Sequence, residues 1–81
     1  MATYKIIDDM KIKQREGVVV SYLDKTPDYA GMSMKLVCEG QVYHYNVLMD
    51  SPKAIVIDSP KSFVGKIIEF LPEVFPRQVA Y

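Results

Sequence analysis

The feature that most constrains the fold of this chain is a pair of apolar runs separated by only two residues. Residues 34–38 and 41–48 flank the dipeptide Glu39-Gly40. A two-residue loop that contains glycine, set between apolar runs, is typical of a β-hairpin. The cross-strand pairs that this turn predicts are Cys38 with Gln41, Leu36 with Tyr43, Met34 with Tyr45, Val37 with Val42 and Lys35 with His44. We therefore expect antiparallel β-structure in the middle of the chain.

Three further segments are predicted as strands. Residues 4–12 alternate between apolar and charged side chains, which indicates a strand with one face toward water. The apolar side chains of one parity are Tyr4, Ile6, Met10 and Ile12, whereas Ile7 lies among the charged ones. Residues 18–23 are apolar on both parities, which indicates a strand that is covered on both sides or that crosses a barrel wall. Residues 54–57 form the third, short strand.

Residues 62–71 are compatible with a strand or with a helix. The apolar residues at 63, 64, 67, 68 and 71 have the spacing of one helical face, with Ser59 as a cap and Pro72 as a stop. Gly65 and two adjacent isoleucines oppose a helix. The predicted fold class is mainly β, a small closed β-barrel of about six strands. The alternative is an α+β fold, a five-stranded antiparallel sheet with a C-terminal helix near residues 60–71.

The length of 81 residues predicts one small β-rich domain spanning 1–81, with residues 72–81 as a proline-broken tail. Ten basic residues balance ten acidic ones, so non-specific nucleic-acid binding is not favoured. Cys38 is the single cysteine, which excludes an internal disulfide. The start lacks the apolar run of a signal peptide, and no stretch approaches the ~20 apolar residues that span a bilayer. We expect a cytoplasmic protein with no membrane partner.

The first two predicted strands carry a family resemblance. Residues 4–13, a short turn and the segment REGVVVS at 15–21 resemble the opening of the second, β-barrel domain of translational GTPases of the elongation-factor type. Residues 29–36 look like the next step of that domain, and residues 63–70 look like its closing, glycine-led strand. The resemblance covers roughly residues 4–71. It implies a six-stranded closed barrel that docks RNA ends or protein partners and carries no chemistry itself.

The residue types that catalysis uses do not assemble into a predicted site. In the hairpin register, Cys38 and His44 fall on opposite faces of the ribbon, whereas a nucleophile and its base must lie within hydrogen-bond reach. One histidine and one cysteine do not supply the ligands that zinc needs. Asp8 and Asp9 are adjacent, so in a strand they point to opposite sides. We expect no enzyme activity, no metal and no cofactor.

Binding is the function that remains, and two surfaces are candidates for it. The first combines the basic side chains of Lys11, Lys13 and Arg15 with the rings of Tyr43, His44 and Tyr45. The second is the tail, with Phe75 and Tyr81. In the plainer alternative, the basic residues form a solvated face, the tyrosines belong to the core and the tail packs back over the barrel.

We predict a non-catalytic module that binds an unidentified protein, as an accessory or inhibitory factor. The neutral charge and the six tyrosines favour this function, because tyrosine is enriched in interfaces. The alternative is binding of RNA or single-stranded nucleic acid through the basic and aromatic face.

Overall fold

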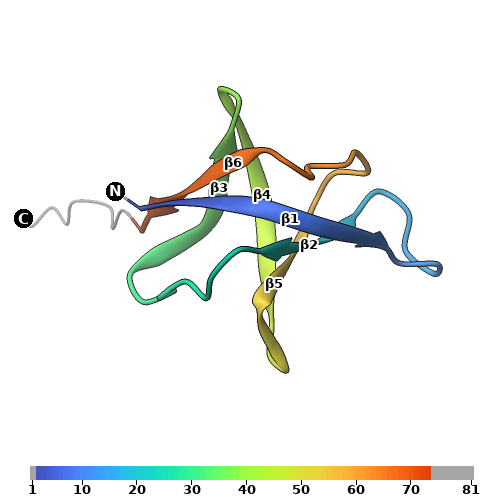
Figure 1. Ribbon diagram of the computed structural model, residues 1–81, viewed down its shortest axis with the longest axis horizontal. Coiled ribbons are helices and arrows are strands. Elements are labelled where there is room, and N and C mark those ends of the chain that lie inside the picture. Colours follow the sequence, from blue (N-terminus) through green and yellow to red (C-terminus); the bar gives the residue numbers. More distant parts are fainter. Residues whose placement is uncertain (1, 74–81) are drawn as a thin grey trace, which may run out of the picture.

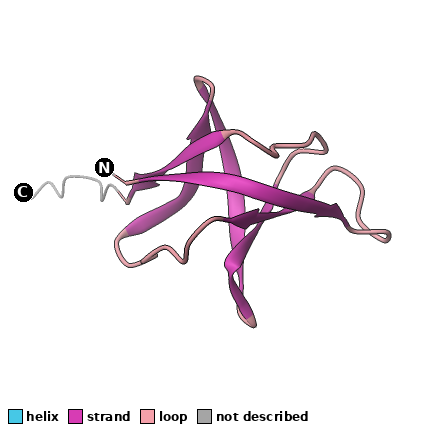
Figure 2. Ribbon diagram, in the orientation of Figure 1, coloured by secondary structure: helices cyan, strands magenta, loops and turns pink. Residues whose placement is uncertain are grey.

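Residues 2–73, the part of the chain described by this computed structural model, form a closed antiparallel β-barrel (Figure 1). Its strands are β1 (Thr3–Lys11), β2 (Val19–Leu23), β3 (Met32–Cys38), β4 (Gln41–Leu48), β5 (Ser51–Ile57) and β6 (Ile67–Pro72). Around the barrel the order is β1-β2-β5-β4-β3-β6, and β6 pairs back onto β1. The predicted mainly-β closed barrel is therefore confirmed. Figure 2 shows only strands and loops in the described segment.

The central hairpin has the predicted register. The β3–β4 ladder runs from the Lys35–His44 pair to the Cys38–Gln41 pair, and both turn residues have positive φ, 52° at Glu39 and 81° at Gly40. Two successive positive φ values belong to a type I′ turn, whose twist matches that of the flanking strands. The ladder does not extend to the predicted pair of Met34 with Tyr45, since Met34 is exposed and Tyr45 is buried.

A β-bulge in β1 changes which residues of this strand face the core. Ile6 pairs with Leu23 and Asp8 pairs with Tyr22, so Ile7 is an extra residue on β1. Tyr4 and Ile6 are buried as predicted, but Met10, predicted on the same face, is 53% exposed. The bulge reverses the alternation after Ile6, because one inserted residue moves every later side chain to the opposite face. The prediction that Met10 lies on the face of β1 away from water, with Tyr4 and Ile6, was therefore wrong.

The valine-rich strand β2 is buried on both faces, as its apolar residues on both parities predicted. Val19 and Leu23 point into the barrel and belong to the main core. Val18 and Val20 lie on the outer side, in a second cluster with Ala54 and Val56 of the neighbouring strand β5. The half-buried side chains that pack against this outer cluster are Ile12, Tyr22 and Leu48.

Barrel closure decides the conformation of residues 62–71. Ile67–Pro72 form β6, which pairs with β1 on one side and β3 on the other. The helix near residues 60–71 was the wrong alternative, because residues 67–69 pair with β1 and residues 69, 70 and 72 pair with β3, so neighbouring strands supply the partners of this backbone. The expected helical face is also split, since Phe63 and Ile68 are buried while Val64 is exposed.

Aromatic rings fill much of the interior. Phe70 contacts Tyr4, Tyr29 and Tyr45, with ring centroids 5.3, 5.7 and 4.9 Å apart. Phe63 is fully buried although it lies outside the strands, and its ring forms a T-shaped contact with that of Tyr43, with centroids 5.1 Å apart and an interplanar angle of 83°. Small barrels are commonly filled by side chains in this way.

Candidate functional site

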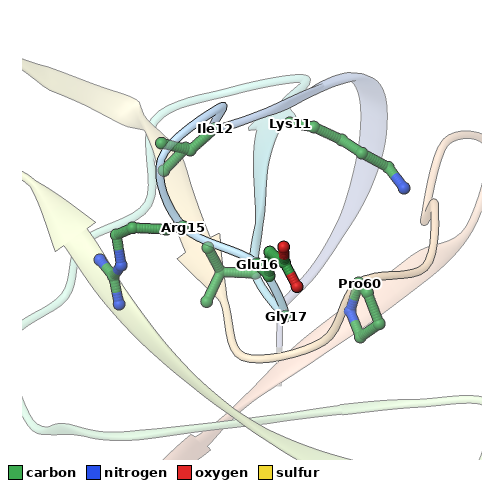
Figure 3. A pocket seen from close by; sticks show the side chains of 7 residues that line it. Lys11, Ile12, Arg15, Glu16, Gly17 and Pro60 are labelled. Carbon is green, nitrogen blue, oxygen red and sulfur yellow. The ribbon is translucent and has the colours of Figure 1, made fainter.

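The three basic residues predicted as a binding face lie at the tip of the β1–β2 connection. Lys11, Lys13 and Arg15 are all exposed, and Lys11 and Arg15 line one shallow hollow of about 400 Å³ together with Glu16 and Pro60. Figure 3 shows the side chains of Lys11 and Arg15 extending to opposite sides, with the Glu16 carboxylate between them. The cluster is therefore divided, and an acidic group interrupts its positive charge.

Arg15 and His44 are brought together by the fold. They line a smaller hollow of about 170 Å³ with Asn46 and Asp58, above the outer valine Val56. The backbone of Asp58 is fixed beside β4, because its N–H donates to the His44 carbonyl at 2.9 Å. The hollow offers a guanidinium, an imidazole, an amide and a carboxylate, which are groups that can recognise a polar ligand.

The two predicted tyrosines occupy different environments. Tyr45 is only 2% exposed and its hydroxyl donates to the Ser33 carbonyl at 3.0 Å, so its ring belongs to the core. Burial raises the pKa of the Tyr45 phenol. Tyr43 is half-buried, its hydroxyl donates to Gln41 Oε1, and Lys61 Nζ lies 5.1 Å from its ring centroid. Tyr43 alone of this pair keeps part of its ring at the surface.

The remaining candidate residues do not lie beside the exposed basic residues and His44. Phe75 and Tyr81 lie outside the described residues. Cys38 is buried in the core while His44 is exposed, so the prediction that they occupy opposite faces of the hairpin is confirmed. Burial raises the pKa of the Cys38 thiol, and the adjacent Glu39 acts in the same direction. A buried thiol with a raised pKa is a poor nucleophile, since the reactive species is the thiolate.

Sequence reasoning missed an exposed surface on the outer side of β1, which we call the β1 face. It consists of Ile7, Asp8, Met10 and Tyr22, and these residues line an open hollow of about 430 Å³ together with Asp9. Ile7 is 55% exposed and Met10 is 53% exposed. The sequence signal for this face was Ile7, the one apolar residue among the charged side chains that alternate with the apolar ones along β1. The contribution of Met10 was hidden, because it depends on the bulge.

The polar atoms on and beside the β1 face are partly satisfied within the chain. Asp8 Oδ1 accepts a hydrogen bond from the backbone N–H of Asp9 at 2.9 Å. Asp9 Oδ2 accepts one from Ser62 Oγ at 2.6 Å. Among residues 2–73, the only side-chain ion pair joins Lys66 to Glu39, at 3.1 Å. Asp8 and its neighbour Asp9 therefore have no cationic partner in the described segment.

Further chemical features of the described segment are few. Residues 2–73 contain no group of three or more histidine, cysteine, aspartate or glutamate side chains placed to hold a metal ion. The same segment contains no helix that is long and apolar enough to cross a bilayer.

The fold and the surface define a class of protein, a small closed β-barrel with a filled interior and an open hollow on the outside of β1 and β2, lined by apolar and acidic side chains. No protein-family model, curated protein or solved structure matches this chain.

Proposed function

We propose that this protein is a non-catalytic protein-interaction module that docks its partner on the β1 face. The observation that carries the proposal is the pair of large apolar side chains, Ile7 and Met10, each more than half exposed beside the half-buried Tyr22. Grouped apolar side chains on a small protein mark an interaction surface, because their contact with water is unfavourable until a partner covers them. Tyrosine and methionine are both enriched in such interfaces.

The β-bulge supports the same proposal. Bulges re-aim side chains and are over-represented beside functional sites. In an unbulged strand, Met10 would point inward and Asp8 would be directed at the core. The bulge instead places Asp8 and Met10 on the outside together with Ile7.

The resemblance to the second domain of elongation-factor GTPases agrees with a docking role, since those barrels bind partners and leave the chemistry to other domains. We propose that the protein acts in the cytoplasm as an accessory or inhibitory factor in this manner.

Site-specific photo-crosslinking in the source cell tests the proposal. A photo-reactive residue replaces Met10, and the matched control carries it at Met49, a 94% exposed methionine in the β4–β5 turn. We expect a discrete adduct from position 10 that position 49 does not give and that Ile7→Lys removes. Equal adduct patterns from both positions, or none from position 10, would contradict docking on the β1 face.

A second candidate function is binding of RNA or single-stranded nucleic acid, favoured by the hollow that Arg15 shares with His44. Arginine and histidine side chains donate hydrogen bonds to phosphate groups. Tyr43 supplies no stacking surface at this hollow, because it precedes His44 in β4 and packs against the core on the opposite face. The burial of Tyr45 and the position of Glu16 between Lys11 and Arg15 make this candidate the weaker one.

Titration with short oligonucleotides at low and moderate salt tests the second candidate. Binding that weakens with salt, and that is lost in a Lys11→Ala/Lys13→Ala/Arg15→Ala variant, supports it. The control variant is Lys53→Ala, which removes an exposed positive charge from β5. Absence of binding at low salt would exclude this function.

A further inference from the structure

We infer that the partner that covers the β1 face is a second copy of this chain, with the two β1 strands antiparallel across a two-fold axis. This inference rests on the docking function proposed above and specifies its partner. It follows from the order of side chains along the outer side of the strand.

The outer side of β1 presents a cation, an apolar group, an anion and a second apolar group in succession. Lys5 pairs with the exposed Ile67 of β6 and points outward, since its neighbours Tyr4 and Ile6 are buried. Ile7, Asp8 and Met10 follow on the same outer side because of the bulge. Lys5 and Asp8 therefore flank Ile7 with opposite charges.

This order is self-complementary. In a two-fold interface residue i meets residue j and residue j meets residue i, so every contact between different residues occurs twice. Because Ile7 is the extra residue of the bulge, Lys5 and Asp8 lie one ladder position on either side of Ile6. An axis at the level of Ile6 therefore places Lys5 of each copy beside Asp8 of the other and brings the two Ile7 side chains close to the axis. The pairing buries apolar surface at the centre and forms two ion pairs at its margins.

The charges favour a second copy over an acidic or a basic partner. A strongly basic partner would match Asp8 but repel Lys5, and a strongly acidic partner would do the reverse. Neither Lys5 nor Asp8 forms an ion pair within residues 2–73, so both are available. The chain has ten basic and ten acidic residues, so two copies approach without long-range repulsion.

The contact involves essentially one strand from each copy, so we expect weak association. Interfaces at the small end of the range are transient, and we expect a dissociation constant on the order of 100 µM. The dimer should therefore be detectable at millimolar protein concentration and should dissociate on dilution.

Sedimentation equilibrium with charge-reversed variants tests the inference. Lys5→Asp alone and Asp8→Lys alone should each weaken self-association by about tenfold or more, because each creates like-charge contacts twice in the dimer. Mixing the two variants should restore association, because each aspartate of the Lys5→Asp copy then faces a lysine of the Asp8→Lys copy. The control Lys35→Asp reverses another exposed charge and should leave association unchanged.

Three results would overturn the inference: a monomer at every concentration, equal effects of the control and the two variants, or no recovery on mixing. Circular dichroism of each variant verifies that the barrel is folded, as expected for substitutions of exposed side chains. A monomeric protein that still forms an adduct with another protein through position 10 would reject the second copy and retain docking on the β1 face. Absence of adducts at position 10 in the cell would reject the docking function, whatever the state of the purified protein.

Discussion

Replacement of Ser21 by alanine should stabilise the barrel. Ser21 lies in β2 between Val19 and Leu23, is completely buried, and its Oγ has no hydrogen-bond partner. Its cross-strand neighbours are Asp9 and Ile55. Burial of an unsatisfied hydroxyl costs about 1–3 kcal/mol, because its hydrogen bonds to water are lost without replacement.

Removal of the hydroxyl leaves a small void. At about 24 cal/mol per Å³, a void of roughly 15 Å³ costs about 0.4 kcal/mol. The gain from removing the unsatisfied group exceeds this cost, so we expect a net stabilisation of about 1 kcal/mol. In a domain of this size that change raises the Tm by about 4–8 °C.

Urea unfolding followed by far-ultraviolet circular dichroism measures the effect, with the m-value expected to stay constant. The matched control is Val19→Ala, a fully buried neighbour on the same face of the strand, which should lose about 2 kcal/mol through lost apolar burial. A Ser21→Ala variant that is less stable than the parent by more than about 0.5 kcal/mol would refute the reasoning, because the hydroxyl would then be making a favourable interaction that exceeds its burial cost.

Three further perturbations test other parts of the structure. Glu39→Asn should stabilise the hairpin by about 0.5 kcal/mol in thermal unfolding, because asparagine tolerates the positive φ at this position. The control Glu39→Gln removes only the ion pair with Lys66 and should stay within about 0.5 kcal/mol of the parent. A loss of stability in Glu39→Asn beyond that of Glu39→Gln would contradict the turn assignment. Phe63→Ala should destabilise the folded barrel by about 3–5 kcal/mol and Phe63→Leu by clearly less, since the ring is fully buried against Tyr43. Similar small losses in both variants would show that Phe63 does not fill the interior. Burial raises the pKa of Tyr29 to about 12, with smaller contributions from neighbouring tyrosines. The folded state therefore holds the phenol proton more tightly than the unfolded chain does. The stability that this proton contributes is present below pH 10 and should be lost as the pH rises toward 12. Phenolate absorbance of the parent and of Tyr29→Phe measures that titration, and a phenolate signal near pH 10 that disappears in Tyr29→Phe would contradict the shift.

Local chemistry made the hairpin and the strand segments predictable. The turn at Glu39-Gly40 and the apolar runs beside it fix the register over only a few residues, so Leu36 pairs with Tyr43 as expected. The double-sided burial of β2 was also visible in its consecutive valines. These signals depend on neighbouring residues along the chain, and the sequence displays such neighbours directly.

The candidate site was much less predictable. The basic residues near the β1–β2 connection and the aromatic residues in β4 were chosen because each group is clustered along the chain. Tyr45 is nevertheless part of the core, and Lys11 and Arg15 extend in different directions. The β1 face was missed because the exposure of Met10 depends on a bulge. That bulge is defined by how β1 pairs with β2, a contact between separate segments.

The sequence by itself determined that this chain is a β protein with a central hairpin and a valine-rich strand buried on both sides, because turn chemistry and side-chain alternation act locally. Only the tertiary structure decided that residues 67–72 form a strand, because the edges of β1 and β3 supply the partners that a helix would have found within itself. It also decided which side chains of β1 meet water, because strand pairing determines where an extra residue is accommodated.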